Sequence, residues 1–126
     1  MLLRNSTDKT AKGEAAETTA EQFLQHLGLR TLEKNFRCRL GEIDLIMMHG
    51  ETLVFVEVRL RTNPYFSSAA ESVNSKKQQK IIRTAQLYLQ QHQLSERVSC
   101  RFDVVTLARA DAAAKPEWIQ NAFGGF

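Results

Sequence analysis

The chain has 126 residues, of which 43% are hydrophobic and 25% are charged. This length and composition are typical of one globular domain with one hydrophobic core, and they exclude a largely disordered chain. No apolar run approaches the roughly 20 residues of a membrane-spanning helix, and the first residues lack the apolar centre of a signal peptide, so we expect a cytoplasmic protein without a membrane partner. The net charge of +3 favours acidic partners such as nucleic acid.

The two cysteines, Cys38 and Cys100, fall within strand-like segments. In a reducing compartment they are expected to be small hydrophobic side chains rather than a disulfide. The three histidines lie far apart in the sequence and show no spacing typical of zinc ligands.

Residues 1–9 are polar and unpatterned, which predicts a flexible tail before a single domain over residues 10–126. From Thr10 to Leu27 the apolar residues recur at helical spacing, and Gly28 is expected to end the helix. Placing the residues at about 100° intervals puts Glu17 at the edge of the apolar stripe. Glu17 is therefore the glutamate of this helix that is expected to face the rest of the protein.

The middle of the chain predicts three strands, over residues 30–39, 42–48 and 53–60. The last two form a β-hairpin through residues 49–52, where Gly50 permits the turn. Residues 61–71 are expected to be a loop, residues 72–92 a second helix, residues 98–107 a strand and residues 116–121 a short closing segment. The order α-β-β-β-α-β predicts an α/β fold, with a mixed sheet flanked by helices.

Acidic residues occupy strand positions in the predicted hairpin. Because side chains alternate between the faces of a strand, Glu57 and Arg59 share one face of the second strand. A four-residue turn pairs Met48 with Leu53 and places Asp44 directly opposite Glu57, whereas a two-residue turn at 49–50 makes Asp44 and Glu57 diagonal neighbours. In either register the two carboxylates lie on one face, within about 4.5–8 Å of each other.

Two carboxylates so close together require a compensating cation, because opposed like charges destabilise a hairpin and burying them unpaired costs more. One solution is a metal ion, and clustered oxygen ligands suit Mg²⁺ or Mn²⁺. The other is a structural ion pair between Glu57 and Arg59, with Asp44 in contact with solvent. The spacing alone leaves both alternatives open.

The assembled residues resemble the uncharacterised bacterial YraN family. That family is similar to archaeal Holliday-junction resolvases, within the restriction-endonuclease-like or PD-(D/E)XK superfamily. The resemblance extends from about Gly13 to Phe123. It rests on a helix with Glu17, on the segments Asn35-Phe36-Arg37, Gly41-Glu42-Ile43-Asp44-Leu45-Ile46 and Val54-Phe55-Val56-Glu57-Val58-Arg59, on Val73 with Lys76-Lys77, on Arg101-Phe102-Asp103-Val104-Val105 and on Asn121-Ala122-Phe123.

The resemblance implies a restriction-endonuclease-like core and Mg²⁺- or Mn²⁺-dependent cleavage of DNA phosphodiesters, with branched or recombination intermediates as substrates. Glu17, Asp44 and Glu57 fall on the acidic positions of the superfamily site, where Asp44 and Glu57 hold the metal and Glu17 assists. Arg59 falls on the position of a lysine. Since arginine stays protonated, its expected role is to stabilise the transition state or to orient water. The related resolvases imply a homodimer.

Basic residues gather near these acids and are predicted to contact nucleic-acid phosphates: Arg37, Arg39, Arg61, Lys76, Lys77 and Lys80. For the helix lysines, a solvated helix face is an equal alternative. Asp103 is expected to be a structural acid that binds backbone or an arginine. Two rival functions stay open beside the nuclease: a catalytically silent nucleic-acid-binding module, and a protein-interaction partner in DNA processing.

Overall fold

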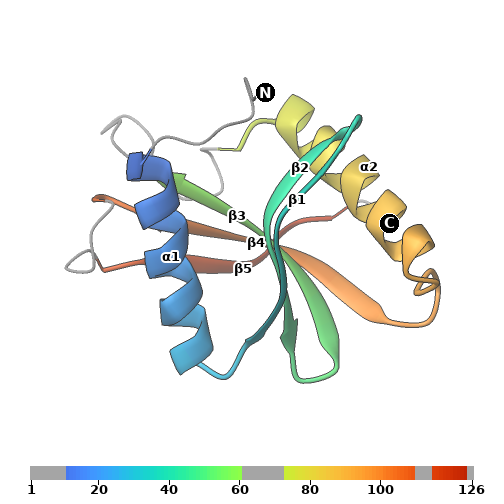
Figure 1. Ribbon diagram of the computed structural model, residues 1–126, viewed down its shortest axis with the longest axis horizontal. Helices are drawn as coiled ribbons and strands as arrows, with labels where there is room; N and C mark the ends of the chain where they lie inside the picture. Colours follow the sequence, from blue (N-terminus) through green and yellow to red (C-terminus); the bar gives the residue numbers. More distant parts are fainter. Residues whose placement is uncertain (1–10, 61–72, 110–114, 125–126) are drawn as a thin grey trace.

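The computed structural model describes residues 11–60, 73–109 and 115–124, which form a mixed sheet between two helices (Figure 1). The elements in chain order are α1 (Ala11–His26), β1 (Arg30–Cys38), β2 (Gly41–His49), β3 (Thr52–Leu60), α2 (Ser75–Gln91), β4 (Ser99–Leu107) and β5 (Glu117–Phe123).

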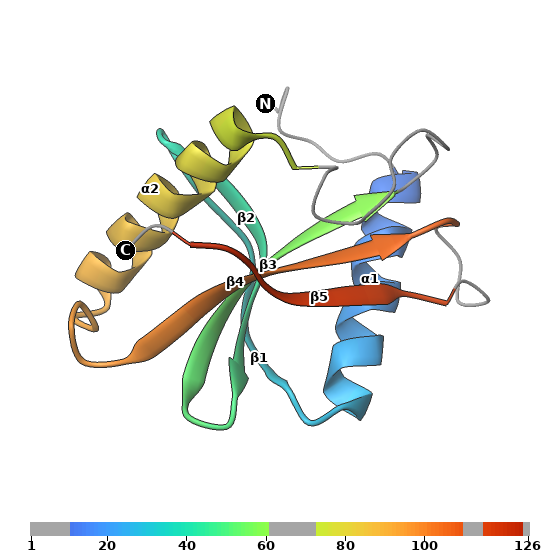
Figure 2. The same cartoon turned by 180° about the vertical axis from the view of Figure 1, so that it is seen from behind.

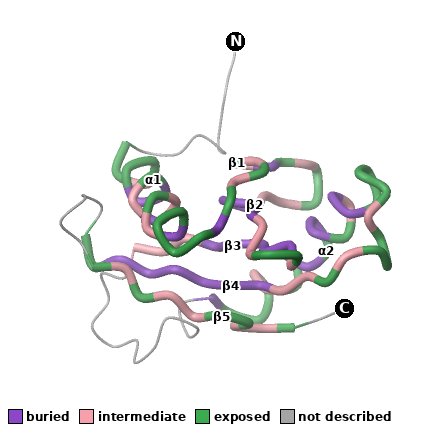
Figure 3. Tube along the Cα trace, turned by 90° about the horizontal axis from the view of Figure 1, so that it is seen from below, coloured by how far each residue is buried: buried purple, intermediate pink, exposed green. Residues whose placement is uncertain are grey.

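The sheet has five strands in the order β1-β2-β3-β4-β5. The pairs β1–β2, β2–β3 and β4–β5 are antiparallel, and the pair β3–β4 is parallel. The chain crosses from β3 to its parallel neighbour through α2, as a parallel connection requires. The central strands β2, β3 and β4 are the most buried, whereas exposed residues recur along the edge strands β1 and β5 (Figure 3).

The helix ends follow local signals in the sequence. Gly28 adopts a φ of 100° just after α1, a conformation that glycine accepts without strain. At the start of α2, the side chain of Asn74 accepts a hydrogen bond of 2.9 Å from the amide of Lys77. This cap satisfies one of the amides that a helix start leaves without a partner.

Two hydrophobic clusters fill the two faces of the sheet. On one face α2 packs its buried side, which includes Ile82 and Tyr88, against Phe55 and Phe102. On the other face Ala16, Ala20 and Leu24 of α1 pack against the strand residues that alternate with those facing α2. Since neighbouring strand residues point to opposite faces, α1 and α2 cover opposite sides of the sheet, as Figures 1 and 2 show.

The predicted fold class and element order are confirmed, with β5 as an additional strand where a short closing segment was expected. The helix that was expected to reach Leu27 ends at His26, and Leu27 lies outside the core with 49% of its surface exposed. The expected tail and the loop at 61–71 lie outside the described residues. Within the described part of the chain, no helix is long and apolar enough to cross a membrane.

Candidate functional site

Asp44 and Glu57 face each other at the open end of the β2–β3 hairpin. Met48 pairs with Leu53 and Leu45 with Val56, so the register is the one in which Asp44 lies opposite Glu57. The pairing ends at Leu45, and beyond it the two strands diverge: the β1–β2 turn lies beside the start of α2, whereas β3 runs on toward α1 (Figure 1). Both carboxylates are buried, each residue being 5% exposed.

Where the backbone pairing of β2 and β3 stops, the carboxylate of Asp44 accepts a hydrogen bond in place of a backbone carbonyl. Its Oδ2 atom accepts a bond of 2.8 Å from the backbone amide of Val58. An amide left unpaired here would cost free energy, since the strands no longer supply a carbonyl. Asp44 is thus fixed by the backbone of the strand that carries Glu57.

The environment of Glu57 raises its pKa from 4.5 to about 8. Burial is the largest cause, and the negative charge of Asp44 is the second. Lys77 and Arg59 lower the pKa, and a side-chain hydrogen bond with Asp44 raises it further. In the absence of an additional cation, the pair therefore retains a proton at neutral pH.

Two cationic side chains reach the same oxygen of Glu57. Nη1 of Arg59 lies 3.6 Å from Oε2, and Nζ of Lys77 lies 3.5 Å from it. The Glu57–Arg59 ion pair considered for the hairpin is therefore present. The accompanying expectation that Asp44 contacts solvent is wrong, because Asp44 is buried. Sequence reasoning placed Lys77 among the phosphate contacts and missed its contact with Glu57.

Glu17 is buried on α1, 5% exposed, whereas Glu14 is exposed and Glu21 half-buried. The prediction that Glu17 is the inward-facing glutamate is confirmed. α1 nevertheless packs on the face opposite to α2, while Glu57 contacts Lys77 of α2. Within residues 11–60, 73–109 and 115–124, no three acidic, histidine or cysteine side chains come together as a metal-binding group.

The donor atoms of Asp44 and Glu57 fit a hard divalent ion. Both residues present carboxylate oxygens, and burial together with the charge of Asp44 raises the pKa of Glu57, so a cation bound there would stabilise the charged form. Mg²⁺ is commonly held by one or two carboxylates and keeps several water molecules, so two protein ligands are sufficient. The metal assignment of Asp44 and Glu57 stays a prediction supported by this chemistry.

The predicted basic residues line two adjoining hollows. One, of about 270 Å³, lies between the β1–β2 turn and α2 and is lined by Arg37, Arg39 and Lys80 among others. The second, of about 280 Å³, is lined by Asn74, Lys76, Lys77 and Lys80. Nε of Arg37 also lies 3.3 Å from Oε2 of Glu42. Arg61 lies outside the described residues.

Asp103 is a structural acid, as predicted. It is fully buried and accepts hydrogen bonds from the guanidinium of Arg101, from Nε1 of Trp118 at 2.9 Å and from the amide of Asn121 at 2.9 Å. Nη2 of Arg101 also lies 2.8 Å from Nδ1 of His49. This network ties β4 to β5 and to the end of β2, and it satisfies the buried carboxylate of Asp103 with hydrogen bonds.

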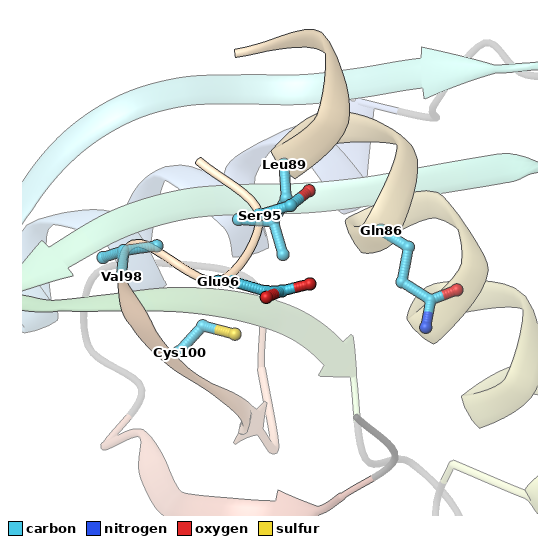
Figure 4. A pocket seen from close by; sticks show the side chains of 6 residues that line it. All are labelled: Gln86, Leu89, Ser95, Glu96, Val98 and Cys100. Atoms are coloured by element: carbon cyan, nitrogen blue, oxygen red, sulfur yellow. The ribbon is translucent and has the colours of Figure 1, made fainter. Parts of the chain in front are cut away.

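A further groove of about 500 Å³ lies at the other end of α2 (Figure 4). It is lined by Gln86, Leu89, Ser95, Glu96, Val98 and Cys100. Burial raises the pKa of the Cys100 thiol, which disfavours the reactive thiolate. Both cysteines are free and half-buried, as expected for a chain without a disulfide.

The mixed sheet, its element order and the position of the hairpin define an α/β protein of the predicted class. Residues 16–107 match the family described as "Uncharacterised protein family UPF0102". The "UPF0102 protein" of Stutzerimonas stutzeri (strain A1501) is 47% identical over 117 residues, which cover 93% of this chain and 98% of the relative. That of Methylobacillus flagellatus is 48% identical over 111 residues, covering 88% and 95%. The chain belongs to this family, and its predicted YraN membership is confirmed.

Proposed function

We propose that this protein is a cytoplasmic, metal-dependent nuclease that cleaves nucleic-acid phosphodiesters, with DNA as the substrate. The observation that carries the proposal is the contact between two buried carboxylates, Asp44 and Glu57, at the open end of a hairpin. A buried acid pair of this kind destabilises the fold unless a cation compensates it, which is typical of a functional site.

The acidic and the basic side chains of the site have different proposed roles. Asp44 and Glu57 would hold Mg²⁺ or Mn²⁺, which when bound polarises a phosphodiester and supplies a nucleophilic hydroxide. Arg59 lies beside Glu57 and keeps its proton, so it stabilises negative charge on the phosphate or orients water and does not act as a base. Glu17, which is buried on α1, would assist the site as the family resemblance implies.

The basic hollows support a nucleic-acid substrate. Lys76, Lys77 and Lys80 occupy the start of α2, a helix whose first turn contains no acidic residue. Lysines are unfavourable near the positive end of a helix dipole, so a bound anion would relieve their repulsion. Arg37 and Arg39 extend the cationic surface along the β1–β2 turn. A phosphate backbone is the ligand that fits this surface best.

The test is a cleavage assay with purified protein, Mg²⁺ or Mn²⁺, and linear, flapped and four-way DNA. We expect cleavage that is abolished by EDTA and reduced at least about 10²-fold by Asp44→Asn or by Glu57→Gln, since each substitution removes a charged ligand. Glu14→Gln is the matched control, because Glu14 is exposed on α1. Cleavage that survives both site substitutions would contradict the assignment.

A silent nucleic-acid-binding module is the second candidate, and the observation that favours it is the presence of arginine at position 59 beside Glu57. In that case DNA binds and binding weakens steeply with salt, but no substrate is cut with any divalent ion. Absence of both binding and cleavage would favour a protein-interaction role in DNA processing.

A further inference from the structure

Lys77 connects the carboxylate pair with the basic hollow at the start of α2. Its ammonium lies 3.5 Å from Oε2 of Glu57, the same oxygen that Arg59 approaches at 3.6 Å. Its side chain also lines the hollow formed with Asn74, Lys76 and Lys80. Because the side chain is 38% exposed and has a flexible stem, it is free to turn from one partner to the other.

A divalent ion changes which of these positions is favourable. Without an ion, the buried pair of Asp44 and Glu57 shares one proton at neutral pH and keeps one negative charge, which Arg59 and Lys77 face. With an ion held by Asp44 and Glu57, the charge of the carboxylates is compensated, and the ion repels both neighbouring cations. Arg59 is carried by the same strand as Glu57, whereas Lys77 comes from α2, so Lys77 is the cation that leaves.

The hollow that receives the Lys77 ammonium already holds an excess of positive charge. Lys76 and Lys80 are exposed there, and the first turn of α2 contains no acidic residue. A third ammonium in this place is stabilised only by an anion. The entry of an anion and the departure of Lys77 from Glu57 therefore favour each other.

We propose that Lys77 is a phosphate-binding residue of this site: it pairs with Glu57 when no ion is bound, and a divalent ion on Asp44 and Glu57 releases it to a nucleic-acid phosphate. This inference rests on the proposed function. Its consequence is a positive coupling between the ion and the nucleic acid, each of which binds more tightly when the other is present.

The experiment measures the affinity for a short fluorescent DNA duplex by anisotropy, in EDTA and in Ca²⁺, with a gel to verify that the DNA stays intact. Ca²⁺ is the probe because it takes oxygen ligands. We expect Ca²⁺ to tighten DNA binding of the unchanged protein by about tenfold, within the usual range of such couplings. Lys77→Met keeps the stem and removes the charge, so it should lose most of this effect.

Lys76→Met is the matched control, since Lys76 is the exposed neighbour in the same hollow and no contact joins it to Glu57 in the described part of the chain. It should weaken DNA binding by a similar factor with and without Ca²⁺, and the coupling should persist. Titration calorimetry with Mn²⁺ in the absence of DNA gives an independent readout. Lys77→Met should bind the ion at least as tightly as the unchanged protein, because it lacks the competing ammonium.

The outcomes distinguish a failure of the role proposed for Lys77 from a failure of the proposed function. A coupling that persists undiminished in both Lys77→Met and Lys77→Gln would overturn the role of Lys77 and leave the proposed function in place. An unchanged protein that binds neither Mn²⁺ nor DNA would overturn both. Loss of coupling in the Lys77 variants alone, with Mn²⁺ binding retained, supports the inference.

Discussion

At the scale of single residues, Glu57 is placed where burial destabilises its charged form. Its pKa of about 8 lies above the value of 4.5 for an unperturbed glutamate, chiefly because the carboxyl is buried. Between these two values the folded protein keeps a proton that the unfolded chain has released. The folded state therefore binds more protons than the unfolded state, and stability must fall as the pH rises through this window.

We accordingly expect the free energy of unfolding of the metal-free protein to decrease from about pH 5 to pH 8, by at most about 1.4 kcal/mol per pH unit. Glu57→Gln should flatten this dependence and make the protein more stable at pH 8, because the neutral amide needs no proton. Urea unfolding at a series of pH values measures the effect. Glu14→Gln on the exposed side of α1 is the control, and a stability that rises from pH 5 to 8 would contradict the prediction.

The residues of the site were partly predictable from the sequence. Asp44 and Glu57 could be placed on one face because strand alternation and hairpin register are local properties, and the observed pairing of Met48 with Leu53 selects the register that opposes them. The contact of Lys77 with Glu57 was not predictable. It depends on where α2 lies on the sheet, and the chain between β3 and α2 gives no local signal for that placement.

At the scale of elements, the approach of α2 to the start of β2 sets the shape of the site. Gly41 has a φ of 154°, and a Cβ atom added there would lie 2.9 Å from Oγ1 of Thr84. The Thr84 hydroxyl donates a hydrogen bond of 2.8 Å to the carbonyl of Lys80, so it cannot move away without losing that bond. Glycine at 41 therefore lets the β1–β2 turn lie against α2.

Gly41→Ala should destabilise the protein by about 1–3 kcal/mol, since it combines a strained backbone conformation with a steric clash. The second substitution Thr84→Ala should restore part of the loss by removing the clash, while the backbone strain persists. A double-mutant cycle of urea unfolding measures the interaction between the two positions. Gly50→Ala in the β2–β3 turn is the control for positive φ alone, because nothing lies within 4 Å of its Cβ position. Purely additive effects at 41 and 84 would refute the steric explanation.

Most elements were predicted within a few residues, because their patterns are local: Gly28 ends α1, Gly50 forms the hairpin turn, and the buried side of α2 has helical spacing. β5 was harder to predict. Its pairing with β4 is irregular between Phe102 and Val104, and Asn121 adopts a φ of 54°. Its attachment relies on Asp103, which binds both Trp118 and the Asn121 amide across the sheet.

At the scale of the whole molecule, the sheet separates the two helices that carry predicted site residues. α2 brings cations to the face that carries Glu57, whereas α1 brings Glu17 to the other face. The sequence indicated that Glu17 points inward, but helical periodicity cannot tell which face of a sheet a helix covers. This distinction required the tertiary structure.

The basic surface also belongs to the whole molecule, because the β1–β2 turn and the start of α2 form it together. If Arg37, Arg39, Lys76, Lys77 and Lys80 all neutralise phosphates, the logarithm of the DNA affinity should fall against the logarithm of salt concentration with a slope of about −4 to −5. Lys76→Gln combined with Lys80→Gln should reduce the steepness of the slope by about two, since each lysine contributes about −0.9.

Arg97 provides the matched control for this measurement. It is exposed just beyond the other end of α2, and Arg97→Gln makes the same change in net charge as one of the lysine substitutions. A general attraction between a cationic protein and DNA would respond equally to charge removed at either end of the helix. A phosphate path over the start of α2 would respond only to the lysines, because counterions are released where phosphates are contacted. Equal effects of Arg97→Gln and of a single lysine substitution would therefore contradict the path and leave only a non-specific attraction.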